Sequence, residues 1–166
     1  LYDGPQTTTT RLWFAAEDLS LARAVFINRL DKPEADFDTA LDLCKERFGN
    51  NVGAVTIPMG TASDFKGVID VVHMKARHLE KGKVVEEDIP AEYADAAEEA
   101  REALIDLVAE ADDDVMMAYL EGEEVTQEDI ENCLSTAIRE RIFVPAFAGA
   151  AVKEEGVISF LNAVVA

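Results

Sequence analysis

Two short, uninterrupted apolar segments, far apart in the chain, constrain the fold most strongly. They occupy residues 24–27 (AVFI) and 142–147 (IFVPAF), and each leads into a loop and then a helical pattern. Uninterrupted apolar runs of this length are typical of strands buried on both faces, as in parallel sheets covered by helices. The sequence therefore predicts an α/β fold in which both strands belong to one parallel sheet, although residues 28–141 separate them.

Two helices are expected within the first 49 residues. Residues 11–18 predict a short helix with Leu12 and Trp13 on its inner side. Asp36 is a good N-cap for a second helix at 37–48, which carries apolar residues at helical spacing and ends before a glycine.

The residues that follow predict an inserted α+β unit. Short strands joined by tight, and therefore antiparallel, connections are expected at 52–58, 68–72, 74–79 and 84–85. Helix-starting residues precede helical apolar patterns at Pro90, Asp112 and Thr126. We therefore divide the chain into residues 1–49, the insert 50–140, and residues 141–166, which return to the parallel sheet.

Acidic residues are concentrated in one stretch of the chain. The 166 residues contain 34 acidic and 15 basic side chains, a net charge of −19. Residues 80–140 hold 21 acids and 4 bases, a net charge of −17, which leaves −2 for the remainder. The acidic stretch is either a solvated helical surface or a docking surface for a basic protein. A charge of this sign disfavours binding to a nucleic-acid backbone, so no DNA partner is expected.

Composition also limits where the chain functions. No apolar run reaches the roughly 18 residues of a membrane helix, so no membrane contact is expected. The cysteines, Cys44 and Cys133, are too few for a disulfide framework and lack metal-ligand spacing. These features predict a reduced, cytoplasmic chain without a metal site.

The loops after the two apolar segments are the candidate binding residues, because ligands of open α/β sheets bind beyond the carboxyl ends of the strands. Asn28-Arg29-Leu30-Asp31 nearly matches the Asn-Lys-x-Asp motif of guanine-nucleotide-binding proteins. An ionised Asp31 can accept both the ring N–H and the amino group of guanine. Asn28 would tie the loop to its neighbours, and the Ala151 N–H could donate to the guanine carbonyl. The alternative is a plain turn, since Asn and Asp bond their own backbone.

A resemblance to a known family extends over nearly the whole chain. In order and spacing, several distinctive runs are similar to the nucleotide-binding domain of bacterial elongation factor G. These runs include residues 25–48, 57–60, 64–70, 74–76, 87–90, 119–124, 149–153 and 156–157.

The resemblance implies a partial P-loop NTPase-type parallel sheet interrupted by an α+β subdomain of short antiparallel strands and acidic helices. It gives base-recognition positions to Asn28, Arg29, Asp31, Ala150, Ala151 and Val152. It implies GTP or GDP as ligand, with Mg²⁺ in the intact parent, and an insert that contacts the ribosomal stalk protein. The parent would couple GTP hydrolysis to the movement of tRNA and messenger RNA through the ribosome.

The sequence departs from the family pattern in ways that predict weak nucleotide binding. Arg29 replaces a lysine whose stem packs over the base, and Ala150 replaces a serine whose hydroxyl supports Asp31. Residues 1–166 contain no G-x-x-x-x-G-K-[ST] loop, no assignable Mg²⁺ ligand and no recognisable catalytic residue. In the family the phosphate-binding parts lie upstream of the matched region, so this chain resembles an excised piece.

Three expectations follow from these departures. The chain alone neither hydrolyses GTP nor binds it tightly. It associates with itself in concentrated solution, with Trp13 and Phe14 partly exposed. The alternative function is an acidic protein-interaction module whose nucleotide loops have decayed.

Overall fold

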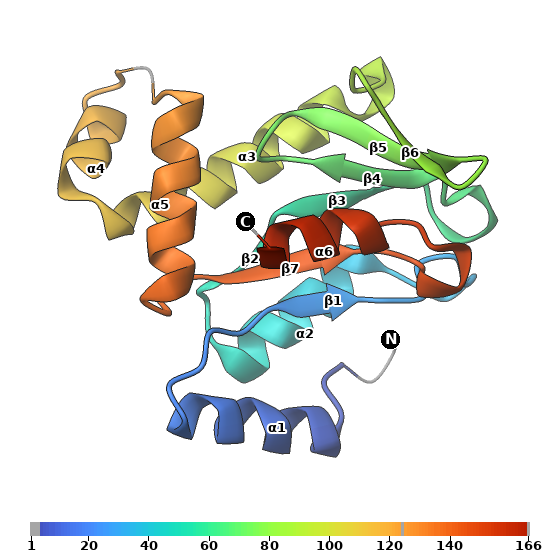
Figure 1. Ribbon diagram of the computed structural model, residues 1–166, viewed down its shortest axis with the longest axis horizontal. Coiled ribbons are helices and arrows are strands. Elements are labelled where there is room, and N and C mark those ends of the chain that lie inside the picture. The colour runs from blue at the N-terminus through green and yellow to red at the C-terminus, as the bar shows by residue number, and fades with distance from the viewer. Residues whose placement is uncertain (1–3, 124, 166) are drawn as a thin grey trace.

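The two apolar segments do form neighbouring parallel strands. The computed structural model describes residues 4–123 and 125–165 (Figure 1). Its parallel sheet has the order β1-β7-β2, formed by β1 (Val25–Ile27), β7 (Val144–Ala148) and β2 (Val52–Ala54). Phe26 lies opposite Phe147 in the register of β1 and β7. The predicted α/β sheet with an inserted subdomain is therefore confirmed.

The central strand β7 separates two hydrophobic cores. Val144 and Ala146 face a core shared with Trp13 and Leu41, whereas Phe147 faces the second core. This alternation follows from the two-residue period of strand side chains. β1 lies at an edge of the three strands, and its Val25 and Phe26 are only half-buried. The prediction that this strand is buried on both faces was therefore wrong.

Helices α1 (Thr7–Asp18) and α2 (Phe37–Phe48) cover the first core. Asp36 caps α2 as predicted, accepting the Thr39 N–H at 2.7 Å. α1 begins at Thr7, earlier than the predicted start at Arg11. Trp13 of α1 is buried because its ring stacks on Phe48 of α2, with centroids 4.0 Å apart, so its predicted exposure was wrong.

The outer face of α1 also differs from the prediction. Leu12, expected on the inner side, is 60% exposed, and Phe14 is exposed as predicted. The helix turns Trp13 inward because the indole ring fills the space beside Phe48, while Arg23 lies over its other face at 4.5 Å.

The antiparallel sheet begins immediately after β2. Its order is β3-β4-β5-β6, formed by β3 (Thr56–Met59), β4 (Gly67–Asp70), β5 (Lys75–Glu80) and β6 (Lys83–Glu87). The prediction of one strand over 52–58 was wrong, because Val55 divides it. The Val55 N–H donates to Ala146 of β7 and its carbonyl accepts from Val71, so this residue connects the two sheets. The chain thus passes from the parallel to the antiparallel sheet at Val55.

Three helices of the insert close the second core. They are α3 (Ala94–Val108), α4 (Asp113–Leu120) and α5 (Gln127–Arg139). Asp112 caps α4, and Thr126 with Asp129 forms a capping box on α5, both as predicted. Pro90 is followed by a 3₁₀ turn, Ala91–Tyr93, before α3 begins. Other 3₁₀ turns are Ala62–Asp64, Ala109–Ala111 and Ala151–Lys153.

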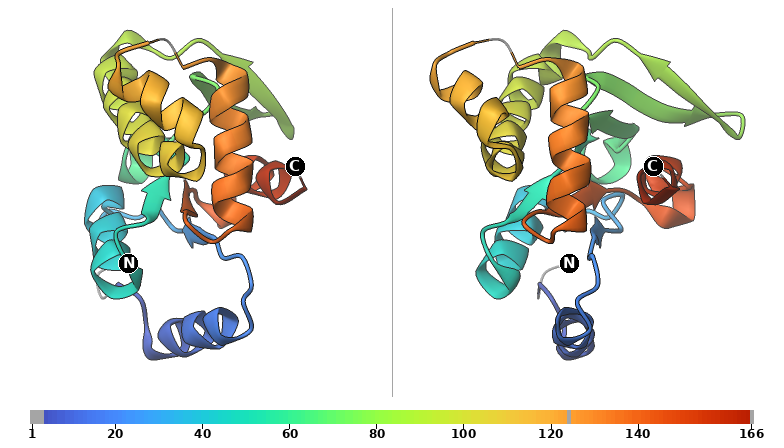
Figure 2. Two further views of the ribbon diagram at one scale, coloured as in Figure 1. Left: turned by 90° about the vertical axis from the view of Figure 1, so that its left-hand side faces the viewer. Right: turned by 60° about the vertical axis from the view of Figure 1, so that its left-hand side comes forward.

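The insert packs on the parallel sheet as a second layer. Figure 2 shows α3, α4 and α5 grouped at one end of the molecule, with α1 at the opposite end. Leu104 of α3 and Ile130 of α5 share the second core with Phe143, which directly precedes β7. Gly53 of β2 makes this approach possible, because a Cβ there would lie 2.6 Å from the Phe143 ring and 2.7 Å from Leu107.

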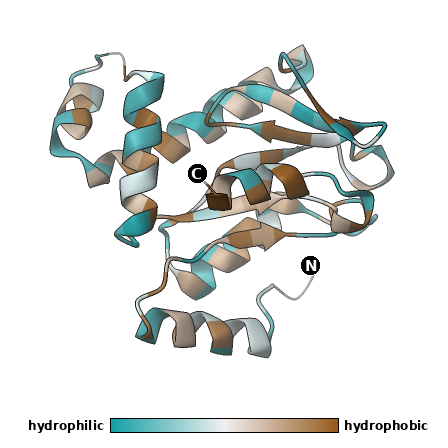
Figure 3. Cartoon of the chain, viewed as in Figure 1, coloured by the Kyte–Doolittle hydropathy of each residue, from teal (hydrophilic) through white to brown (hydrophobic). Residues whose placement is uncertain are grey.

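The C-terminal helix α6 (Val157–Val165) lies beside β1 and β7 (Figure 1). Its Phe160 ring contacts Phe147 edge-on at 5.2 Å and Phe26 at 5.5 Å. In Figure 3 apolar residues colour the central strands and α6, whereas much of β5, β6 and α5 is hydrophilic. Among the described residues, the structure has no helix both long and apolar enough for a membrane span.

Candidate functional site

The two predicted loops lie side by side at the carboxyl ends of β1 and β7. Parallel neighbouring strands end at the same edge of a sheet, so the loops that follow them meet there. The Gly149 N–H donates to the Ile27 carbonyl at 3.1 Å, and the Leu30 N–H donates to the Gly149 carbonyl at 3.2 Å. Two main-chain hydrogen bonds thus hold the loops together.

Asn28 connects the loops through its side chain. Its Oδ1 accepts the N–H of Ala151 at 2.9 Å and the N–H of Arg29 at 2.7 Å. Arg29 has a φ of 67°, in the left-handed region, and the Asn28 contact helps to hold this uncommon conformation. Asn28 therefore ties the loop to its neighbour in the way its position after β1 predicts.

Asp31 presents its carboxylate at the rim of the sheet. The side chain is only 8% exposed, and Oδ2 lies 3.1 Å from the ammonium group of Lys32. The hydrogen bond from Lys32 lowers the pKa of Asp31 below its ordinary value, and the charge of Lys153 on the other loop acts in the same direction. Asp31 is thus ionised at neutral pH and is a hydrogen-bond acceptor.

The residues of the second loop have unequal exposure. Ala150 is fully buried in the first core, and its N–H donates to the Glu155 carbonyl at 3.0 Å. Ala151 and Val152 begin the 3₁₀ turn Ala151–Lys153, and Val152 is 87% exposed. The structure therefore brings the first loop against Ala150 and Ala151, while Val152 faces solvent beside them.

The whole chain matches a known protein family. The family described as elongation factor Tu GTP binding domain matches residues 1–166. This chain belongs to that family. A crystal structure of a protein from Thermus thermophilus is 30% identical to it, with a TM-score of 0.85 over 97% of this chain. The chain spans 24% of the length of that relative.

Membership of the elongation factor Tu GTP-binding family confirms the predicted translational GTPase assignment at the level of the family. It also confirms the guanine nucleotide as the ligand class of the domain. The assignment to elongation factor G within this family, and the roles of the six loop residues, stay predictions.

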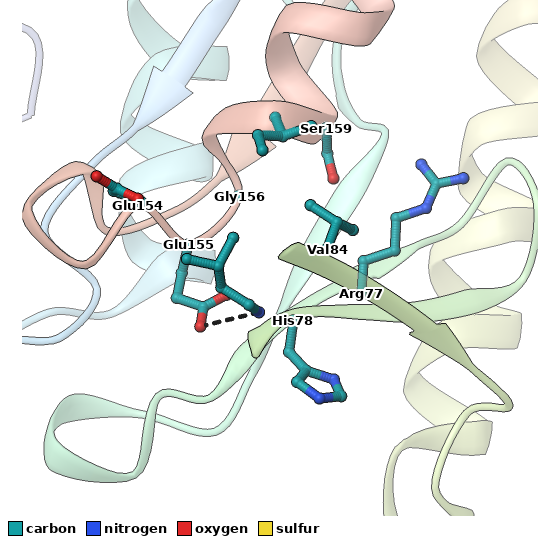
Figure 4. A pocket seen from close by; sticks show the side chains of 9 residues that line it. Arg77, His78, Val84, Glu154, Glu155, Gly156 and Ser159 are labelled. Carbon is teal, nitrogen blue, oxygen red and sulfur yellow. Dashed lines mark hydrogen bonds between the residues drawn. The ribbon is translucent and has the colours of Figure 1, made fainter. Parts of the chain in front are cut away.

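Glu155 is the site residue that the sequence did not reveal. Its backbone carbonyl accepts from Ala150, and its carboxylate accepts the N–H of Leu79 in β5, at 3.2 Å for Oε1 and 3.1 Å for Oε2 (Figure 4). Burial raises the pKa of Glu155, while the Leu79 N–H, His78 and Lys153 oppose the rise. No spacing pattern marks this residue, because its partner lies in a distant strand.

The described residues do not fit a magnesium site. Within 4–123 and 125–165, no group of three or more His, Cys, Asp or Glu side chains is placed to hold a metal ion. At nucleotide sites Mg²⁺ is usually held by one or two carboxylates together with substrate phosphates and waters, and the site carboxylate Asp31 is already paired with Lys32. No magnesium contact is therefore assigned to the described residues.

Proposed function

We propose that this chain supplies the guanine-recognition loops of an elongation factor G-like translational GTPase. The observation that carries the proposal is the 2.9 Å hydrogen bond between Ala151 N–H and Asn28 Oδ1, which joins the two loops at one sheet edge. Reading a purine edge with both loops requires an acceptor from one loop and a donor from the other to lie close together. The parent would couple GTP hydrolysis to translocation on the ribosome, in the cytoplasm.

Each loop residue has a defined role in the proposed site. Asp31 accepts the guanine ring N–H with one oxygen and the exocyclic N–H with the other, after Lys32 leaves Oδ2. The Ala151 N–H donates to the guanine carbonyl in competition with Asn28. Arg29 stacks on one face of the base, and the exposed Val152 lies at the margin of the site.

Discrimination against adenine follows from this donor and acceptor pattern. Adenine has no pair of adjacent donors for the Asp31 carboxylate, so the carboxylate would be desolvated without a partner. Mismatches of this kind can cost factors of about 10⁴ to 10⁵ in discrimination. Phosphate contacts are separate from this site, since the chain has no phosphate-binding glycine loop.

The acidic insert is the proposed contact for the ribosome and its stalk protein. Residues 80–140 carry a net charge of −17, which favours approach of a basic partner surface. In this proposal the insert and the base loops are two separate binding surfaces of one domain.

Nucleotide titration of the isolated chain tests the recognition loops. Because base contacts act here without phosphate contacts, we expect GDP to bind with a Kd on the order of millimolar. Asp31→Asn should lose at least roughly tenfold in guanine affinity and gain affinity for xanthosine diphosphate, whose exocyclic 2-carbonyl oxygen accepts from the new amide. Asp42→Asn, on an exposed side chain of α2, is the matched control and should bind like the wild type. Chemical-shift perturbation at Asn28 and Ala151 locates the bound base.

The second candidate is an acidic interaction module with decayed nucleotide loops. It is favoured by Ala150, which offers no hydroxyl to Asp31, and by Arg29 in place of lysine. Equal, weak binding of guanosine and adenosine diphosphates by wild type and Asp31→Asn would support this module and contradict guanine recognition. Micromolar GDP binding would instead contradict the expectation that phosphate contacts are needed.

A further inference from the structure

Glu155 is hydrogen-bonded on two sides, by the second base loop and by the antiparallel sheet of the insert. Its carbonyl pairs with Ala150, forming an isolated antiparallel bridge in the second base loop. Its carboxylate receives the Leu79 N–H from the antiparallel sheet of the insert. One residue therefore contacts both the candidate base site and the insert.

The Leu79 N–H needs a partner because β4 is shorter than β5. Pairing between these strands ends with Val68 opposite Arg77, so β5 continues past the end of the ladder. Alternate N–H groups of a strand point to opposite edges. The Leu79 N–H points to the edge that faces β4, beyond the last residue pair of the two strands. The Glu155 carboxylate takes the place of the absent strand carbonyl, with both oxygens within 3.2 Å.

The loop around Glu155 folds closely against the end of β7. Glu154 has a φ of 61° and Gly156 a φ of 78°, so left-handed residues flank Glu155 on both sides. A Cβ at Gly156 would lie 2.3 Å from the Ala148 carbonyl oxygen, which shows how closely the loop folds back on β7.

We propose that Glu155 is a positioning residue that couples the antiparallel sheet of the insert to the base-recognition loop. Displacement of β5 pulls on the Glu155 carboxylate, and the Glu155 carbonyl then displaces the N–H of Ala150. Ala151, the next residue, donates to Asn28, so the displacement reaches the contact that joins the two base loops. The coupling between the two regions does not depend on the proposed function. Its expected consequence, a change in base affinity, does rest on that function.

Amide hydrogen exchange of the ligand-free chain tests the coupling without any nucleotide. In Glu155→Ala, we expect exchange at Leu79, Ala150 and Ala151 each to accelerate by roughly tenfold, the order expected when one hydrogen bond to a charged group is lost. In Glu155→Gln the amide oxygen still accepts from Leu79, so exchange should return to within about threefold of wild type. Glu154→Ala, at an exposed neighbour, is the matched control and should leave all three amides unchanged.

The pattern among the three amides decides the outcome. Acceleration at Leu79 alone would show that the insert is released while the base loop stays in place, which overturns the coupling. Failure of Glu155→Gln to restore protection at Ala150 and Ala151 would also overturn it, since rescue is expected of the intact hydrogen bond. Exchange at an amide of α2, such as that of Leu41, reports global unfolding, and the changes at the three amides are measured relative to it. Because no nucleotide is present, these results are independent of whether Asp31 binds guanine.

Discussion

The base loops and the acidic helices are stabilised in opposite ways. At the base loops, polar atoms are bonded across long sequence separations, as in the contact of Ala151 with Asn28. In α4 and α5 the capping side chains are bonded locally, by Asp112 and by the Thr126–Asp129 capping box. Polar contacts thus specify the geometry of the first region, whereas packing under a solvated surface holds the second.

The charge of the insert and the packing of its helices are independent of each other. The charge distribution marks residues 80–140 as a distinct segment, yet α3 and α5 share a core with Phe143 and Phe147. The insert is therefore a chemically distinct surface on a common hydrophobic body, and it should not unfold by itself.

The largest expected effect comes from removing the ring that joins the two regions. Phe143 is 1% exposed, and Phe143→Ala should lower the free energy of unfolding by about 3–5 kcal/mol. Urea unfolding followed by Trp13 fluorescence reports the body, and far-UV circular dichroism reports the helices of the insert as well. Both midpoints should move together, as expected for a single cooperative unit.

The control for this substitution is Leu120→Ala in α4, where the side chain is 73% exposed. Its effect should stay within about 0.5 kcal/mol. Two separate transitions in the Phe143→Ala variant would contradict the shared core and make the insert an independent unit.

Helix caps should give a smaller effect that differs between the regions. Asp36→Ala removes the cap of α2, which buries four residues, and should cost about 1 kcal/mol of unfolding free energy. Asp112→Ala removes the cap of α4, a helix without a fully buried residue, so α4 should fray with a global cost of only a few tenths of a kcal/mol. Thermal unfolding gives the global cost. Asp36→Asn should keep most of the stability, and equal costs for the two alanine variants would contradict the contrast between the regions.

The smallest expected effect is a pH dependence at Glu155. Burial raises the pKa of this carboxyl in the folded state, so protonation favours the folded protein. Glu155→Gln, which has no charge to bury, should therefore be slightly more stable than wild type at pH 7. The difference should shrink as the pH falls through the folded pKa and vanish below about pH 4, where the carboxyl is protonated even in the unfolded chain.

Urea midpoints of both proteins between about pH 3.5 and pH 7 measure this difference. His78 and Lys153, which oppose the rise in the pKa of Glu155, are present in both proteins. A difference that grew with acidification would show that the hydrogen bond from Leu79 outweighs the cost of burial.

The sequence predicted those features that depend on local pattern. The two apolar runs, the Asp36 cap and the Thr126–Asp129 capping box were found because each has a signature within a few residues. The parallel sheet and the insert followed from the order of these elements.

The remaining features depend on contacts between distant residues. The break at Val55 was missed because both halves of residues 52–58 have strand character, and only Ala146 and Val71 determine that the chain changes sheets there. The burial of Trp13 depends on Phe48, and the site role of Glu155 depends on Leu79. The adjacency of the two base loops could be predicted, but the pairing of Asp31 with Lys32 was not anticipated.

The close approach at Gly53 limits how this domain can diverge. The Phe143 ring and the side chain of Leu107 lie directly against a strand backbone that has no side chain at this point. Even a methyl group there would force the Phe143 ring or the Leu107 side chain to move, so the charge of the insert's outer surface can change more freely than the residues at this contact. Substitutions should therefore be more frequent on the exposed acidic surfaces of the insert than at Gly53, Leu107 and Phe143.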